Sequence, residues 1–215
     1  MNKSKLIERL KRKLFYSIGR AGMDLYAEPP GTEFEKANNF SAHLGGSAGN
    51  IAVALAKLDC EVELVTCFSD DAVGRFASSR LHEFGVGTSH CRIVGGEARN
   101  TLAVIETRLT DCQSIIYRNG AADFEMNSKD VSMLNYKGTG GVIVSGTALA
   151  KEPSRSAIFN VIEHACRAQT PIIIDMDYRP YSWESPEEAK LVYSSAISQC
   201  DIVIGNDVEV GDVAG

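Results

Sequence analysis

The chain has 215 residues, of which 44% are hydrophobic and 23% are charged, and it carries a formal net charge of −6. This composition is that of an ordinary globular protein with one substantial core. The negative charge and the scattered basic residues argue against a nucleic-acid-binding surface, and no run of 18 apolar residues could span a membrane. We therefore expect a cytoplasmic protein with no nucleic-acid and no membrane partner.

The six cysteines lie far apart in the sequence, with no Cys-x-x-Cys pair and no histidines at the spacing of metal ligands. Because most of them occur in apolar stretches, we interpret them as small buried side chains in a reducing compartment. A disulfide framework or a zinc site is not expected. The six are Cys60, Cys67, Cys91, Cys112, Cys166 and Cys200.

The first segments of the chain predict a strand followed by a flap. Residues 1–13 form a basic, amphipathic extension without the apolar core of a signal peptide. Residues 14–20 predict a short strand that ends in glycine. Asp24 lies just beyond this strand, where ligands collect in open α/β sheets, so we expect it to hold a ligand hydroxyl; the alternative is a loop carboxylate that caps a turn. Residues 25–43, with two prolines and then alternating polar and apolar residues, predict a hairpin-like flap.

A diglycine turn, Gly45 and Gly46, leads directly into a predicted helix over residues 47–58. The glycines allow the backbone to approach a ligand closely, and Ser47 is placed to act as the N-cap. The helix N-terminus offers N–H groups and partial positive charge, to which Asn50 adds a side-chain amide. The stretch therefore suits a polyhydroxylated or anionic small molecule, and it equally suits an ordinary helix entry. It is not a P-loop, because no Gly-Lys-Ser/Thr follows.

The middle of the chain predicts one more β/α unit and then a β-rich insert. A strand at residues 62–67 precedes a helix that ends at Phe84, and Asp70 and Asp71 are predicted to cap that helix. From Cys91 to Tyr117 the pattern is strand-like. We interpret this insert and the flap (segments at about 23–44 and 98–120) as a small β lid. Its exposed face could be covered by a second copy, so a homodimer is expected.

The remaining chain alternates strands and helices, which predicts an α/β fold with a doubly wound parallel sheet over residues 14–215. The proline at the predicted first turn of two of the helices supports their starts. The predicted strands are 141–146, 171–175 and 201–205, and the predicted helices are 153–167 and 185–199.

Five motifs follow one another in order: Leu44-Gly45-Gly46-Ser47-x-x-Asn50, Asp70-Asp71-x-x-Gly74, Ser145-Gly146-Thr147, the stretch from Asp175 to Trp183, and Asn206-x-x-Glu209. Together they resemble the PfkB (ribokinase-like) carbohydrate kinases, over nearly the whole chain from about Tyr16. Each motif alone is weak evidence, and their common order and spacing make the resemblance specific. The stretches from Gly19 to Tyr26 and from Asp177 to Trp183 look most like members that phosphorylate a keto-deoxy sugar acid in myo-inositol catabolism.

The resemblance implies a parallel sheet flanked by helices, a β lid that closes over the sugar and commonly dimerises, and transfer of the ATP γ-phosphoryl group to a sugar hydroxyl with Mg²⁺. It also implies roles for particular residues. The sugar would be held by Asp24, Gly45, Gly46 and Asn50, the acid by Arg118 and Arg179, and the phosphates and magnesium by Asn206 and Glu209, with Glu209 as the metal ligand.

The chemistry of arginine supports the assignment of an acidic substrate independently. The planar guanidinium suits bidentate binding of a carboxylate. Arg179 follows a predicted buried strand, where ligands collect, although it could instead be a surface arginine paired with Asp175 or Asp177. For Arg118, at a strand end of the predicted lid, binding and a purely structural role are both open.

The resemblance also shows what the sequence does not contain. The catalytic signature of the family, Gly-Ala-Gly-Asp, supplies an aspartate base and an anion hole, and no Gly-x-Gly-Asp occurs in these 215 residues. No residue of this chain is therefore expected as the catalytic base, and we expect the catalytic aspartate to lie beyond Gly215. The chain is then the N-terminal, sugar-binding portion of the ribokinase-like fold, without its C-terminal part.

Three functional hypotheses follow. The first is a sugar-acid kinase, or the substrate half of one, with 2-keto-3-deoxygluconate, fructose or a nucleoside as alternative substrates. The second is a non-catalytic sugar-binding or interaction module. The third is an unrelated Rossmann-type nucleotide binder, which ranks last because the turn after the first strand lacks Gly-x-Gly-x-x-Gly.

Overall fold

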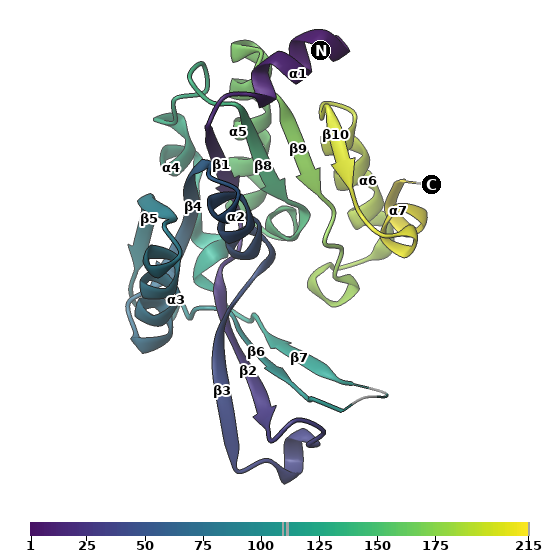
Figure 1. Cartoon of the computed structure of the whole chain (residues 1–215). Helices are drawn as coiled ribbons and strands as arrows, with labels where there is room; N and C mark the ends of the chain where they lie inside the picture. The colour runs from purple at the N-terminus through teal and green to yellow at the C-terminus, as the bar shows by residue number, and fades with distance from the viewer. Residues whose placement is uncertain (109, 111, 215) are drawn as a thin grey trace.

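The computed structural model describes residues 1–108, 110 and 112–214, which form two separate β-sheets with helices around the larger one (Figure 1). The larger sheet has six parallel strands in the order β10-β9-β8-β1-β4-β5. This confirms the predicted α/β fold with a parallel sheet. The six strands are β1 (Leu14–Ile18), β4 (Glu61–Ser69), β5 (Gly87–Val94), β8 (Gly141–Ser145), β9 (Ile172–Asp175) and β10 (Ile202–Ile204).

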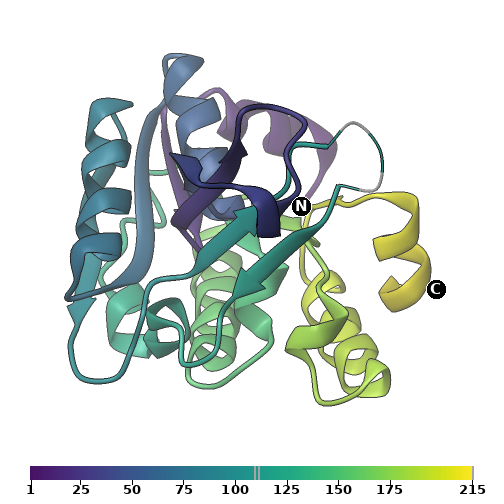
Figure 2. The same cartoon turned by 90° about the horizontal axis from the view of Figure 1, so that it is seen from below.

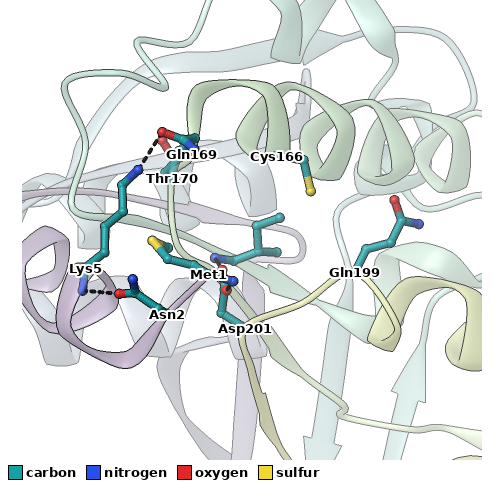
Figure 3. A pocket seen from close by; sticks show the side chains of 9 residues that line it. Met1, Asn2, Lys5, Cys166, Gln169, Thr170, Gln199 and Asp201 are labelled. Carbon is teal, nitrogen blue, oxygen red and sulfur yellow. Dashed lines mark hydrogen bonds and ion pairs between the residues drawn. The ribbon is translucent and has the colours of Figure 1, made fainter.

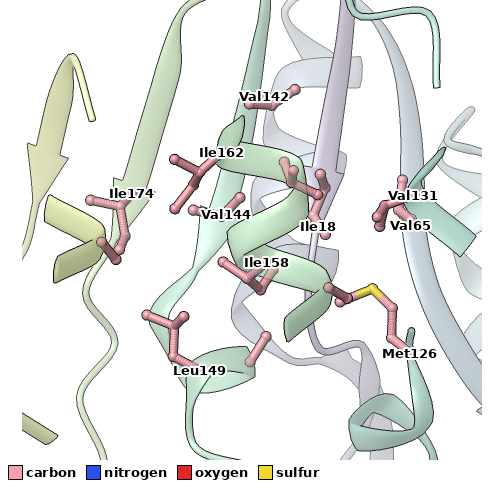
Figure 4. Packing of buried hydrophobic residues seen from close by; sticks show 14 of the residues in the cluster. Ile18, Val65, Met126, Val131, Val142, Val144, Leu149, Ile158, Ile162 and Ile174 are labelled. Carbon is pink, nitrogen blue, oxygen red and sulfur yellow. The ribbon is translucent and has the colours of Figure 1, made fainter. Parts of the chain in front are cut away.

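Helices cover both faces of this sheet, and apolar residues of helices and strands form its core. One face packs against α2 (Ser47–Lys57) and α3 (Ala72–Glu83). The other face packs against α4 (Ser128–Ser132), α5 (Ser154–Ala168) and α6 (Pro186–Ile197). Figure 4 shows the second layer, in which Ile18 and Val144 meet Ile158 and Ile162 of α5. The central strand β8 is buried along its whole length, as a strand with helices on both sides must be.

The smaller sheet has four strands in the order β3-β2-β6-β7. Seen from below, these strands lie across the end of the molecule toward which the arrows of β8 and β9 point (Figures 1 and 2). They lie in the segments predicted at about 23–44 and 98–120, except that β2 begins and β3 ends one residue outside the first segment. Residues 109 and 111 of the second segment lie outside the described part. The four are β2 (Gly22–Glu28), β3 (Asn39–Gly45), β6 (Leu102–Ile105) and β7 (Ser114–Tyr117).

Strand β5 corrects one prediction. The strand-like pattern that begins at Cys91 is interpreted from sequence as the start of the insert, but Cys91 lies in β5, which pairs with β4 at the edge of the larger sheet. No residue of this edge strand is fully buried, so its pattern looks the same as that of a strand in a small separate sheet. Periodicity alone therefore could not assign β5 to its sheet.

The two ends of the chain carry short helices, α1 (Lys3–Leu10) and α7 (Asp207–Ala214). Helix α1 lies at the amino ends of the strands, opposite the smaller sheet (Figure 1). Gly215, the residue beyond which the catalytic aspartate is expected, lies outside the described residues, so the structure does not test that expectation.

Four single 3₁₀ turns connect larger elements of the described chain. They are Phe34–Lys36, Ala122–Glu125, Gly146–Leu149 and Pro180–Ser182. Within the described residues, no helix is long and apolar enough to cross a bilayer.

Candidate functional site

The carboxyl ends of β1 and β8 form the floor of the candidate site. Successive strands are added on one side of β1 as far as β5, and the chain then returns to β8 on the other side. The crevice between β1 and β8 is therefore a topological switch point, where open α/β sheets bind ligands. Gly19, just after β1, packs against the end of β8, since a Cβ at Gly19 would lie 2.8 Å from the Cβ of Ser145. The hydroxyl of Ser47, at the start of α2, lies 2.8 Å from that of Ser145.

The diglycine turn brings the start of α2 close to the segment after β1. Gly46 has a φ of +91°, and a Cβ there would lie 2.5 Å from the carbonyl oxygen of Arg20. Gly46 itself is the N-cap, without a side-chain cap, so the prediction of Ser47 as N-cap is wrong. The Ser47 hydroxyl contacts Ser145 instead. Asn50 is exposed in the first turn, and its backbone N–H donates to the Gly46 carbonyl at 2.9 Å.

Asp24 lies on β2, directly opposite His43 of β3. Its half-buried carboxylate occupies the space beside Gly45, where any Cβ would overlap it. Gly45 therefore allows Asp24 to take this position. Burial raises the pKa of Asp24, while the charges of Arg20 and His43 act in the opposite direction. A carboxylate held this way can accept hydrogen bonds from a ligand hydroxyl.

Arg118, just after β7, is buried and held on three sides. One guanidinium nitrogen donates to the carbonyl of Thr147 at 3.0 Å, and another pairs with the carboxylate of Asp123. The guanidinium carbon lies 4.0 Å from the centre of the Phe124 ring, a cation–π distance. Arg118 also lines a cavity of about 80 Å³ together with Lys151.

Arg179 follows β9 and is more exposed than Arg118, with 38% of its side chain accessible. It pairs with the carboxylate of Asp177, as expected for the alternative of a surface arginine paired with Asp175 or Asp177. It also lies 3.7 Å from the carboxylate of Glu209. Asp177 has a φ of +35°, an uncommon conformation for a residue other than glycine. Strained backbone of this kind is often found at ligand-binding sites.

Asn206 and Glu209 cap the start of α7 reciprocally. The Asn206 side-chain oxygen accepts from the Glu209 N–H at 2.9 Å, and the Glu209 carboxylate accepts from the Asn206 N–H at 3.0 Å. The Asn-x-x-Glu motif is thus a capping arrangement in this structure. Within the described residues, no group of three or more His, Cys, Asp or Glu side chains could hold a metal ion. The residues present therefore do not by themselves fit magnesium.

A network of charges joins three of the predicted site residues. Arg20 is close enough to Asp24 and Arg118 for their charges to act on it, and its guanidinium lies 3.7 Å from Asp177, which pairs with Arg179. Gly45 lies beside Asp24, as described above. Among the described residues, Asn50 is linked to this network through the backbone of the diglycine turn, and Asn206 and Glu209 are linked to it through Arg179.

Arg20 is the residue of this network that sequence reasoning did not select. It is 6% exposed, and its pKa is lowered by burial and then by the nearby charge of Arg118. The sequence did contain a signal, because Arg20 directly follows Gly19 at the end of the first strand. The same strand-end argument that selected Asp24 and Arg179 applies to Arg20.

Comparison with known proteins identifies the family. Residues 12–215 match the family model described as pfkB family carbohydrate kinase. A 5-dehydro-2-deoxygluconokinase of Photobacterium profundum is 38% identical over 192 residues, which are 89% of this chain and 58% of that protein. A 5-dehydro-2-deoxygluconokinase of Geobacillus kaustophilus is 35% identical over 196 residues, which are 91% of this chain and 58% of that protein. The chain thus spans a little over half the length of these relatives.

Solved structures agree on the fold. A 2-dehydro-3-deoxygluconokinase from Thermotoga maritima superposes with a TM-score of 0.83 at 21% identity, covering 95% of this chain and 63% of that one. An uncharacterized sugar kinase from Pyrococcus horikoshii gives a TM-score of 0.83 at 23% identity, covering 94% of this chain and 65% of that one. These likenesses show a ribokinase-like fold, and the match of the family model shows that the chain belongs to the pfkB family of carbohydrate kinases.

Proposed function

We propose that the whole protein carrying this chain transfers the γ-phosphoryl group of ATP to a hydroxyl of a sugar acid, with 5-dehydro-2-deoxygluconate of myo-inositol catabolism as the substrate. The observation that carries the proposal is the convergence of three arginines, Arg20, Arg118 and Arg179, at the carboxyl end of the sheet. Guanidinium groups bind planar carboxylates bidentately, whereas a neutral sugar gives them no charge to bind. The names of the two relatives agree with this substrate.

In this proposal the chain supplies the sugar-binding side. Asp24 accepts hydrogen bonds from sugar hydroxyls, and the close approach at Gly45 and Gly46 brings the N-terminus of α2 to the ligand. Asn50 adds an amide at the rim. The arginines orient the acid, so the reacting hydroxyl is presented in a fixed geometry, which is the main contribution of a kinase active site.

The catalytic aspartate is proposed to lie beyond Gly215 in the whole protein. The family signature Gly-x-Gly-Asp does not occur in the 215 residues, and the matched relatives are longer than this chain. An aspartate from that segment would take the proton of the sugar hydroxyl as the phosphoryl group is transferred. Sugar binding and proton abstraction are then assigned to different parts of the protein.

ATP and magnesium belong to the proposal as the phosphoryl donor and its counter-ion. Magnesium would neutralise charge on the phosphates when bound. Asn206 and Glu209 are the residues we propose on the nucleotide side, with Glu209 as a carboxylate ligand. Glu209 already accepts a hydrogen bond and lies near Arg179, and the described residues hold no cluster for a metal ion, so in this proposal the phosphates of the nucleotide hold magnesium together with Glu209.

A homodimer through the smaller sheet, as a β lid over the sugar, is also proposed. The register places one set of apolar side chains on one face of this sheet, while Asp24 and His43 lie on the other. An apolar sheet face of this kind is a surface for association. We place the protein in the cytoplasm, where ATP is available and widely spaced cysteines stay reduced. The apolar set is Met23, Leu25, Phe40, Leu44, Leu102, Val104, Ile115 and Tyr117.

The test is an ADP-release assay of the whole protein with ATP, Mg²⁺ and a panel of acceptors. We expect kcat/KM for 5-dehydro-2-deoxygluconate to exceed those for 2-dehydro-3-deoxygluconate and fructose by about tenfold or more, a difference of about 1.4 kcal/mol. A preference for a neutral sugar would contradict the proposal. Calorimetric titration of this chain with the acid, without nucleotide, tests the alternative of a non-catalytic sugar-binding module.

A further inference from the structure

Arg20 is a buried cation without a hydrogen-bonding partner for its Nε. The residue is 6% exposed, and its Nε N–H finds no acceptor among the residues that the structure describes. Its ion pair, to Asp177, has a nitrogen–oxygen distance of 3.7 Å, which is beyond hydrogen-bonding range. A guanidinium carries five N–H donors, and leaving donors unsatisfied in a buried position is unfavourable.

Two of the three carboxylates whose charges act on Arg20 are engaged by other groups, and the third is Asp24. Asp123 accepts from Arg118 and from the hydroxyl of Thr101 at 3.0 Å, and Asp177 pairs with Arg179 through Oδ1. Arg118 adds a second positive charge near Arg20. Arg118 and Arg179 each pair with a carboxylate at hydrogen-bonding distance. In the described chain, the ion pair of Arg20 is longer, at 3.7 Å.

Unsatisfied polar atoms gather at this place. In the described part of the chain, four buried side-chain nitrogen or oxygen atoms lack a partner, and three of them are Arg20 Nε, Arg118 Nε and Asp177 Oδ2. Buried polar groups normally find partners, so a local concentration of exceptions indicates a site where a ligand supplies them. The fourth atom belongs to Thr66 in the body of β4.

The backbone fixes Arg20 at the switch point. Its carbonyl accepts the N–H of Gly49 at 3.2 Å, so Arg20 is tied to the first turn of α2. It directly follows Gly19, whose close packing on Ser145 forms the floor of the crevice. Asp24, the proposed hydroxyl acceptor, follows four residues later. The guanidinium is close enough to both Asp24 and Arg118 for their charges to act on it.

We propose that Arg20 binds the carboxylate of the substrate directly and is the main determinant of the preference for an acid over a neutral sugar. The proposal rests on the proposed function, in which the substrate is a sugar acid. A carboxylate fits because its two oxygens match the guanidinium fork and its charge is opposite to that of Arg20. Arg179, which is partly exposed and already paired with Asp177, contributes less to this discrimination.

The test compares 5-dehydro-2-deoxygluconate with its methyl ester, which keeps the hydroxyls and loses the charge, as substrates of the whole protein. The wild type should prefer the acid, and Arg20→Gln should raise the KM for the acid by roughly 30-fold or more, with little change for the ester and for ATP. Arg20→Lys, which keeps the charge and loses the fork, should give an intermediate KM. Arg80→Gln, at an exposed arginine paired with Glu83, is the matched control and should change neither the KM for the acid nor the KM for the ester.

Each outcome decides a separate point. If the wild type phosphorylates neither compound, or prefers the ester, the proposed function fails. Suppose that the wild type prefers the acid. If Arg20→Gln keeps that preference, or raises the KM for the acid and the ester equally, Arg20 does not bind the substrate carboxylate. A rise in the KM for ATP alone would assign Arg20 to a phosphate instead. The melting temperature of Arg20→Gln without ligand should stay within about 3 °C of the wild type; a larger fall would show a structural role.

Discussion

The polar groups at the two ends of the parallel sheet differ in whether they have hydrogen-bonding partners. At the amino end, helix α1 closes on the sheet through contacts that satisfy both partners: the Met1 ammonium lies 3.0 Å from the carboxylate of Asp201, and Lys5 donates to Gln169 at 2.5 Å (Figure 3). These residues line a cavity of about 370 Å³. At the carboxyl end, Arg20 and Asp177 keep atoms without partners, and Asp177 has a positive φ.

We interpret the satisfied polar groups at the amino end as stabilising, and the unsatisfied polar groups at the carboxyl end as ligand-binding. Partners that satisfy each other contribute to the free energy of folding, whereas unsatisfied groups cost free energy unless a ligand completes them. The amino end should therefore respond to mutation through stability alone. The carboxyl end should respond through substrate binding, and in places removing a charge there should stabilise the protein.

The largest expected effect is that of Gly46→Ala, which tests how tightly the carboxyl end is built. The new Cβ would lie 2.5 Å from the Arg20 carbonyl oxygen at a φ of +91°. Overlap and unfavourable φ together should lower the free energy of unfolding by about 2–4 kcal/mol, measured by urea denaturation of this chain. Gly31→Ala is the matched control, because Gly31 has a φ of +96° with nothing within 4 Å. An equal loss in both variants would mean that conformation, and not close packing, decides the effect.

Next in size is Arg179→Ala, which tests the carboxyl end through function. We expect the KM of the whole protein for the sugar acid to rise by about 10- to 30-fold, or about 1.4–2 kcal/mol, because a charged contact to the acid is lost. The melting temperature should change little, since the side chain is partly exposed. Arg167→Ala, at an exposed arginine paired with Glu163, serves as control. Unchanged kinetics in Arg179→Ala would remove this residue from the site.

At the amino end, Asp201→Ala should have the opposite profile. The Asp201 carboxylate pairs with the Met1 ammonium and accepts the backbone N–H of Ile172 at 3.1 Å. Losing both contacts should lower the free energy of unfolding by about 1.5–2 kcal/mol, with the KM for the sugar acid unchanged. The measurements are urea denaturation and steady-state kinetics. A raised KM would show that the two ends of the sheet are coupled.

Much of this fold could be predicted from the sequence because local signals and tertiary structure agree. Ser185 accepts from the Glu188 N–H at 3.1 Å and Asp71 accepts from the Gly74 N–H at 3.0 Å, so both helices begin where their caps predict. The buried run of β9 lies in the parallel sheet. The N-cap of α2 was missed, because the serine that follows two glycines uses its hydroxyl on Ser145, a contact between segments 98 residues apart.

The site could be predicted only in part, for a related reason. The rule that ligands collect at strand ends, together with the family resemblance, selected Asp24, Arg118 and Arg179 as single residues. It could not show that Arg20 joins them, because burial and the lack of a partner are properties of the folded chain. Nor could the sequence show that the Asn206 and Glu209 side chains cap the start of α7.

The smallest expected effect concerns Asp175, at the carboxyl end of β9, and has the opposite sign to that of Asp201. Burial, together with the charges of Asp177 and Glu209, raises the pKa of Asp175 to about 6, against the opposing charge of Arg179. The folded state therefore favours the protonated form. This contribution to stability is fully present below about pH 4, the pKa of an unfolded aspartate, and is lost as the pH rises through 6.

Asp175→Asn should accordingly be more stable than the wild type at pH 7, by about 1 kcal/mol once solvent screening of this half-buried group is taken into account. The gain should vanish at pH 4, where the wild-type carboxyl is neutral. Urea denaturation at pH 4, 5, 6 and 7 measures the difference. A gain that does not change with pH would show that packing, and not charge, distinguishes the two side chains, and a loss at pH 7 would show that the Asp175 carboxylate is satisfied. Removing an aspartate would then destabilise both ends of the sheet, and the contrast between them would fail.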